Sequence, residues 1–183
     1  VVMEPYPHIV IKNALPEALA DKLLAEFPTL DLFPNKINAD NNASPEELSN
    51  RRLDLTAQLI NQNMSISPTW KSIIAYHSSP EFLADFARVF RNAIERYYPH
   101  FGKGKDPLEK MSAGLMSRDE NTDVEFLMNA SIGLNTPVTT KVSRVRGVHI
   151  DRMHEMYAGL LYLRTNDDDS EGGDFEIHKF KGL

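Results

Sequence analysis

The sequence predicts an α+β fold, because helical patterns fill the first part of its 183 residues and strand patterns fill the second. Apolar residues recur at helical spacing as far as Tyr97. After the breaker-rich connection Gly102–Pro107, segments rich in β-branched and aromatic residues alternate with polar or glycine-containing turns. We therefore expect a single domain over residues 1–183, with helices packed on one side of an antiparallel sheet.

Residues 1–107 are expected to form a mostly helical N-terminal support that contains one strand. That strand is predicted at Tyr6–Asn13, where β-branched residues follow a proline and an asparagine ends the run. A helix is expected to begin at Pro16–Glu17, because proline suits the first turn and a glutamate there complements the helix dipole. Pro28 is expected to end this helix.

Three further helix starts follow in the same part of the chain. Ser44–Glu47 has the hydroxyl, proline and glutamate of a capping box, and an interrupted helical pattern comes after it. The apolar members of that pattern are Leu53, Leu55, Leu59 and Ile60. A short helix is predicted around Trp70, and Ser79–Glu81 is expected to cap a helix whose wide apolar stripe reaches Tyr97. The aromatic residues of this stripe indicate core packing.

Residues 108–183 are expected to supply the strands of the sheet. The segments with the composition of strands are Val124–Leu134, Val138–Ile150, Ala158–Leu163 and Asp174–Phe180.

Composition and charge exclude several classes of function. The net charge of −6, without a long basic run, argues against binding to nucleic acid or to an anionic membrane. No apolar run approaches the ~20 residues that span a bilayer. The start at Val1 lacks the basic and apolar regions of a signal peptide, so a cytoplasmic location is expected. The absence of cysteine removes thiolate metal sites and cysteine nucleophiles.

His149 and Asp151 are the residues that suggest chemistry. They are two positions apart in a β-rich run, so on a strand their side chains would point to the same face. A neutral imidazole and a carboxylate on one face are two of the three ligands of the facial triad that holds non-haem Fe(II). A polar pair on a surface strand is the simpler interpretation of this motif taken by itself.

The sequence around this pair resembles the prolyl 4-hydroxylase-like branch of the Fe(II)- and 2-oxoglutarate-dependent oxygenases. The resemblance runs through Arg146–Asp151, Gly159–Arg164 and Glu171–Phe175, and the opening Pro5–Pro16 is also similar. It implies a double-stranded β-helix, or jelly-roll, oxygenase core that begins in residues 108–183 and is buttressed by the N-terminal helices. The implied activity is a dioxygenase that hydroxylates a prolyl, peptidyl or small-molecule substrate.

The resemblance also implies roles for five residues. His149 and Asp151 match the first two iron ligands, and Tyr162 matches a tyrosine that binds the distal carboxylate of 2-oxoglutarate. Phe175 matches an apolar wall of that pocket, and Asn135 lies where relatives place another polar pocket residue. Core packing is the alternative for Tyr162 and for Phe175. The implied cofactors are Fe(II) and the cosubstrate 2-oxoglutarate, with ascorbate as a further candidate and O2 as oxidant.

One part of the family pattern is missing. A distal histidine ligand and a basic residue that pairs with 2-oxoglutarate are expected after Leu183, so we expect the chain to be a fragment that carries two of the three iron ligands. His178 lies in the strand that Gly172 and Gly173 open, which in the family does not carry the distal ligand. The glycines themselves are expected to serve backbone geometry. The alternative function is a non-catalytic, cupin-like β-barrel that only binds.

Overall fold

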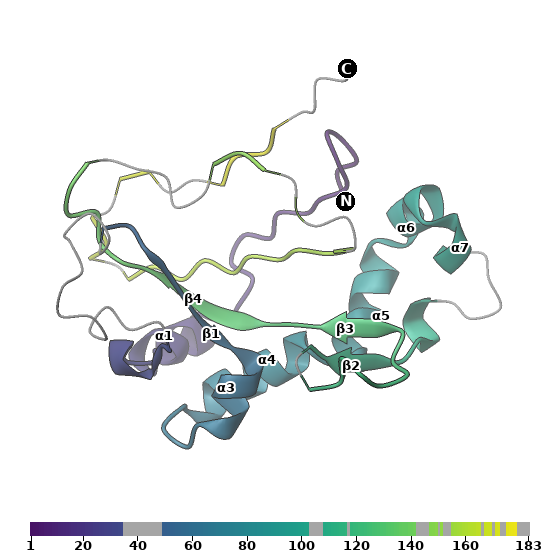
Figure 1. Cartoon of the computed structure of the whole chain (residues 1–183). Coiled ribbons are helices and arrows are strands. Elements are labelled where there is room, and N and C mark those ends of the chain that lie inside the picture. Colours follow the sequence, from purple (N-terminus) through teal and green to yellow (C-terminus); the bar gives the residue numbers. More distant parts are fainter. Residues whose placement is uncertain are drawn as a thin grey trace.

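The computed structural model describes residues 1–34, 49–102, 108–116, 118–141, 147–149, 151, 155–165, 167–169, 171–172 and 175–178. Within these residues, helices fill most of the chain up to residue 102, and short strands follow (Figure 1). The elements, in chain order, are α1 Glu17–Ala25, η1 Leu30–Leu32, β1 Arg52–Thr56, α3 Ala57–Gln62, α4 Pro68–His77, α5 Pro80–Val89, α6 Arg91–Tyr97, α7 Pro99–Gly102, η2 Leu108–Lys110, β2 Ala113–Leu115, β3 Phe126–Met128 and β4 Ser131–Asn135. This mixture of helices and strands agrees with the predicted α+β class in its coarsest sense.

The helix α5 begins at its predicted cap, and α4 lies where a short helix is predicted around Trp70. The side chain of Ser79 accepts a hydrogen bond from the amide of Phe82 at the start of α5, and Ser67 does the same for Trp70 at the start of α4. Each serine satisfies an amide that has no partner inside the helix, and a proline follows each one in the first turn. The apolar stripe predicted as one helix is divided at Phe90, between α5 and α6.

The helix expected after Ser44–Glu47 is wrong in its first part. Leu53 and Leu55 lie in β1, where both side chains are buried and their neighbours are partly or fully exposed. This alternation is that of a half-buried strand. β1 pairs antiparallel with β4, so Leu53 lies opposite Leu134 and Leu55 opposite Ile132. The capping box itself lies outside the described residues.

Two small sheets carry the strands. β2 and β3 form a parallel pair, and β3 continues after two residues into β4, which places the two sheets end to end (Figure 1). The ladder of β1 and β4 extends one residue further at Thr136. Its amide donates to the carbonyl of Arg51 at 2.9 Å, and its hydroxyl accepts from the amide of Arg51 at 2.7 Å.

The larger hydrophobic cluster, which we call cluster 1, lies between the β1–β4 sheet and the helices α1, α3 and α4. Its fully buried members include Leu23, Phe33, Leu53 and Ile60. A buried hydrogen bond of 3.0 Å, from the indole nitrogen of Trp70 to the carbonyl of Leu23, ties α4 to α1. Cluster 1 therefore joins elements from both parts of the chain.

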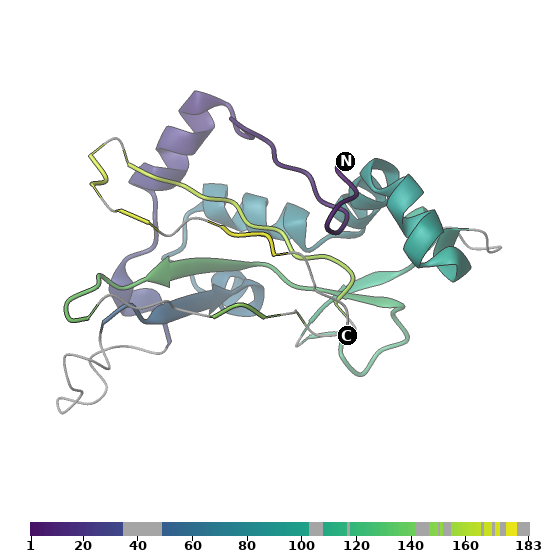
Figure 2. The same cartoon turned by 90° about the horizontal axis from the view of Figure 1, so that it is seen from above.

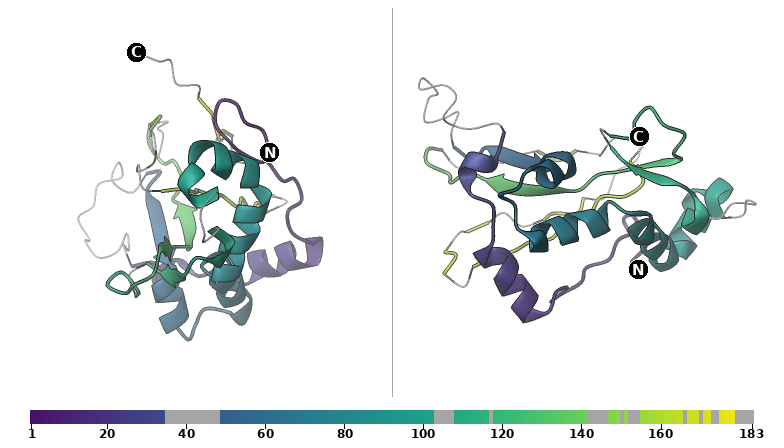
Figure 3. Two further views of the ribbon diagram at one scale, coloured as in Figure 1. Left: turned by 90° about the vertical axis from the view of Figure 1, so that its right-hand side faces the viewer. Right: turned by 90° about the horizontal axis from the view of Figure 1, so that it is seen from below.

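Cluster 2 lies at the other end of the molecule, where α5 and α6 pack near β2 and β3 (Figure 3). Its buried members are Leu83, Phe86, Ala87, Ile94 and Leu108. Partly buried Phe126 and Met128 of β3 pack against it. Because β3 leads directly into β4, the two clusters are connected through one continuous stretch of chain.

The N-terminal strand predicted at Tyr6–Asn13 is wrong. A single bridge joins Val2 and His8, and residues Ile9–Asn13 lie in no strand. Val10 and Ile11 are 75% and 64% exposed. A β-rich composition forms a strand only where a neighbouring strand accepts its hydrogen bonds, and this segment has no ladder beside it among the described residues.

After Asn135 the described residues contain neither helix nor strand. Residues 155–165 cross the molecule from cluster 2 towards cluster 1 (Figures 1 and 2). The double-stranded β-helix stays a prediction, since the described strands form two two-stranded sheets. Across the described part of the chain, no helix has the length and apolar character to cross a membrane.

Candidate functional site

His149 and Asp151 lie beside each other, although neither residue lies in the strand from which their proximity was predicted. The Nε2 atom of His149 is 3.4 Å from Oδ1 of Asp151. The other ring nitrogen, Nδ1, is 2.7 Å from the carbonyl oxygen of Gly147. Because a carbonyl oxygen only accepts, the proton of this hydrogen bond is on Nδ1. In the neutral ring, Nε2 then carries a lone pair and lies 3.4 Å from the carboxylate oxygen.

Two electron-rich atoms at this distance repel each other unless water or a positive charge lies between them. A proton on Nε2 would supply it and make an imidazolium–carboxylate pair. A divalent metal ion would also supply it, with Nε2 and Oδ1 as ligands. A ligating histidine commonly donates its second ring N–H to a backbone carbonyl, which fixes the ring orientation, and the carbonyl of Gly147 is placed for that role.

The separation of the two atoms fits a shared metal ion. Ligand atoms at about 2.1 Å from a metal, and about 90–110° apart around it, lie about 3.0–3.4 Å from each other. The 3.4 Å between Nε2 and Oδ1 falls at the upper end of this range and exceeds the usual length of a hydrogen bond. The donor set of one imidazole and one carboxylate suits Fe(II).

The pair is open to solvent and has two members. The side chains of His149 and Asp151 are 40% and 46% exposed. Among the residues that the structure describes, no group of three histidine, aspartate or glutamate side chains could hold a metal ion. Nε2 of His178 lies instead 3.1 Å from Oε2 of Glu176, in a second His–carboxylate pair. The open positions around the first pair leave room for further ligands.

The other predicted site residues make none of their described contacts with this pair. Tyr162 and Phe175 are 62% and 58% exposed, and Asn135 ends β4 opposite Arg52. Over the described ranges, no hydrogen bond, ion pair or ring contact links these three residues to His149 or Asp151. Their roles stay predictions. Gly172 has a φ of +81°, which confirms its predicted use for backbone geometry.

Two features of this region were missed by reasoning from the sequence. The carbonyl of Gly147 that holds the imidazole belongs to the backbone, so no side-chain pattern could indicate it. Tyr157 contacts Phe82 and Phe86 of α5 through its ring, and burial raises the pKa of its hydroxyl. The aromatic stripe of α5 was a signal that another ring would pack against it.

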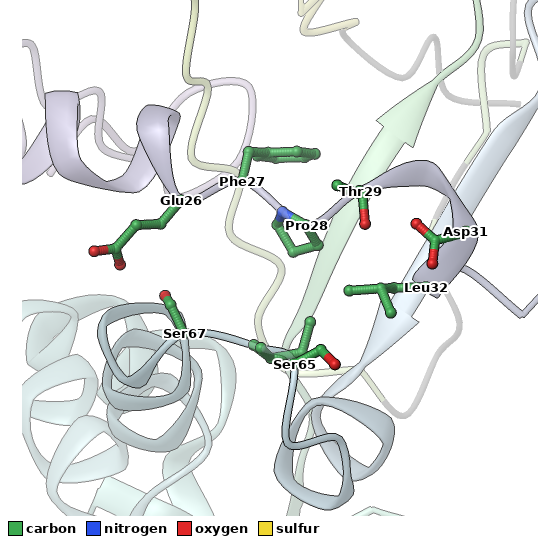
Figure 4. A pocket seen from close by; sticks show the side chains of 9 residues that line it. Glu26, Phe27, Pro28, Thr29, Asp31, Leu32, Ser65 and Ser67 are labelled. Atoms are coloured by element: carbon green, nitrogen blue, oxygen red, sulfur yellow. The ribbon is translucent and has the colours of Figure 1, made fainter.

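A hollow of about 360 Å³ lies elsewhere, between the end of α1, η1 and the turn that joins α3 to α4 (Figure 4). Phe27 and Pro28 form one wall, and Ser65 and Ser67 lie across from them (Figure 4). None of the residues predicted for the site lines this hollow. The hydroxyls of Thr69 and Ser67, at the start of α4, lower the pKa of Glu26. The Glu26 carboxylate therefore lies beside the first turn of α4, and it also lies 3.9 Å from Lys22 of its own helix.

No family model, curated protein or solved structure matches the chain. The functional proposal therefore rests on the motif of the sequence and on the geometry of His149, Asp151 and Gly147.

Proposed function

We propose that the protein is a non-haem Fe(II)- and 2-oxoglutarate-dependent dioxygenase that hydroxylates a peptidyl or small organic substrate. The observation that supports this most is the convergence of Nε2 of His149 and Oδ1 of Asp151 at 3.4 Å, with Nδ1 held by Gly147. The resemblance to the prolyl 4-hydroxylase-like branch selects iron among the metals that such a pair can bind.

The residues of the pair have distinct tasks in this proposal. His149 supplies a neutral nitrogen ligand, because its hydrogen bond to Gly147 keeps the proton on Nδ1. Asp151 supplies a negative oxygen ligand that offsets part of the metal charge. Fe(II), when bound with 2-oxoglutarate and O2, supplies the oxidation that replaces a C–H bond of the substrate with C–OH.

Three further residues belong to the proposed site. The Tyr162 hydroxyl donates a hydrogen bond to the distal carboxylate of 2-oxoglutarate. Phe175 forms an apolar wall, and Asn135 offers an amide to the cosubstrate or substrate. The exposure of Tyr162 and Phe175 leaves both side chains free to make these contacts.

Metal titration tests the proposal directly. We expect the chain to bind Mn2+, a stand-in for Fe(II) that is not oxidised in air, and we expect His149→Ala and Asp151→Ala to weaken binding by more than about tenfold. His178→Ala is the matched control, because His178 also lies close to a carboxylate two residues away. Equal affinity in wild type and in both site variants would show that a proton, and not a metal, joins the pair.

Turnover tests the second half of the proposal. With Fe(II), 2-oxoglutarate and O2, we expect succinate release that is lost in His149→Ala and in Asp151→Ala. Metal binding without succinate release in wild type would favour the cupin-like binding module. The two measurements together separate the enzyme from a protein that only binds a metal.

A further inference from the structure

Tyr157 is held at two points of its side chain. Its ring centroid lies 4.8 Å from that of Phe86 and 5.6 Å from that of Phe82, both at tilted angles on α5. Such contacts between aromatic rings contribute to packing beyond the area they bury. The ring thus contacts the face of α5 at one end of the segment Tyr157–Leu163, while 44% of the Tyr157 surface stays exposed.

The far end of the Tyr157 side chain folds back over its own segment. A Cβ atom built on Gly159 would lie 2.7 Å from Cζ of the tyrosine ring, closer than side-chain carbons approach one another. To make room for such a group, the far end of the Tyr157 ring would have to shift from its position against Phe82 and Phe86. Gly159 is therefore the residue that allows Tyr157 to close over the backbone.

Leu163 fixes the other end of the same segment, because it packs against cluster 1. Between the two fixed ends, Leu160, Leu161 and Tyr162 are 60%, 46% and 62% exposed. The segment therefore runs between the two clusters (Figure 2). Its middle residues are exposed to solvent. The position of Tyr162 depends on the two anchors, since its own side chain is not packed into a core.

We propose that Tyr157 is a positioning residue, which latches the segment Tyr157–Leu163 onto α5 and so fixes where Tyr162 meets 2-oxoglutarate. The latch consists of Tyr157, Gly159, Phe82 and Phe86. Its effect on the cosubstrate rests on the proposed function, whereas the latch itself rests on ring contacts and on the space over Gly159.

Titration of the tyrosine hydroxyls tests the latch without any ligand. Burial raises the pKa of Tyr157, and a hydrogen bond to Asp85 raises that of Tyr76, so a Tyr76→Phe background removes the second late-titrating group. In this background we expect Gly159→Ala to release the ring and return Tyr157 to the ordinary range. Late titration that persists in Gly159→Ala would overturn the latch.

Binding of 2-oxoglutarate to the Mn2+-loaded chain tests the positioning role. We expect Tyr157→Leu and Gly159→Ala to weaken this binding about tenfold, the size of a lost hydrogen bond to a charged group. Tyr157→Phe keeps the ring contacts and should restore wild-type affinity, and Leu160→Ala, an exposed neighbour, should leave it unchanged. The affinity for Mn2+ should be the same in all variants.

The wild-type chain distinguishes the two ways of failing. If wild type binds no 2-oxoglutarate, the proposed function and the positioning role are both overturned. If wild type and Tyr157→Leu bind it equally well, the positioning role alone is overturned.

Discussion

Two leucine-containing stretches of this chain differ sharply in burial. In β1, Leu53 and Leu55 are 0% and 1% exposed, whereas Leu160 and Leu161 of the segment Tyr157–Leu163 are 60% and 46% exposed. β1 has an antiparallel partner in β4 and helices over one face, whereas among the described residues the later stretch pairs with no strand and packs against the two clusters near its ends. Apolar composition alone therefore does not bury a strand; a partner and a cover do.

The comparison predicts very different responses to the same substitution. Leu55→Ala removes a buried side chain from cluster 1 and should lower the free energy of unfolding by about 2–5 kcal/mol, through lost burial and a cavity. Leu160→Ala should change it by no more than about 0.5 kcal/mol. Urea unfolding measures both. Similar losses for the two variants would show that the segment around Leu160 is packed as firmly as β1.

Trp70→Phe tests how much the hydrogen bond between α4 and α1 stabilises cluster 1. The substitution removes the indole N–H that donates to the Leu23 carbonyl and leaves this buried acceptor without that donor. We expect a loss of about 1–3 kcal/mol in the free energy of unfolding. Tyr76→Phe is the control, because it removes a hydrogen bond to Asp85 at an exposed site and should have a smaller effect. A larger loss of stability in the control would show that the contact between α4 and α5 matters more than the one between α4 and α1.

Ser79→Ala tests a purely local signal. The Ser79 hydroxyl accepts from the Phe82 amide, so its loss should reduce the free energy of unfolding by about 1 kcal/mol. Ser79→Asp restores an acceptor at the cap and should recover most of this loss. Equal stability of wild type and Ser79→Ala would mean that packing of α5 in cluster 2, and not its cap, decides where the helix begins.

These regions also show what could be predicted from the sequence. Helix starts at Ser79 and near Trp70 were predictable, because a cap and an apolar stripe lie within a few residues of each other. β1 was not, because Leu53 and Leu55 precede a short helix, and their strand is decided by β4, which lies far along the chain. Strands depend on such distant partners, while helices satisfy their hydrogen bonds locally.

The candidate site likewise has one feature that was predicted from the sequence and others that were not. The proximity of His149 and Asp151 was predicted from a strand, on which residues two apart share a face; the two side chains lie 3.4 Å apart, although neither residue lies in a strand. The carbonyl of Gly147 and the latch of Tyr157 depend on backbone direction and on α5, which no motif records. Where Tyr162 points depends in turn on that latch, so its role could be inferred only from the resemblance.

The dependence of stability on pH provides the smallest test, again within cluster 1 and its surroundings. Hydroxyls of Thr69 and Ser67 hold the pKa of Glu26 below its ordinary value of 4.5. A carboxyl group whose pKa is lowered by folding stabilises the folded state above its unfolded pKa, and this contribution disappears as pH falls through the folded pKa.

The difference in unfolding free energy between wild type and Glu26→Gln should therefore be largest near neutral pH and shrink below about pH 4.5. Thr69→Val, which removes the largest cause of the shift, should shrink the same difference at neutral pH. Parallel pH profiles for wild type and Glu26→Gln would contradict the assigned role of this carboxylate at the start of α4.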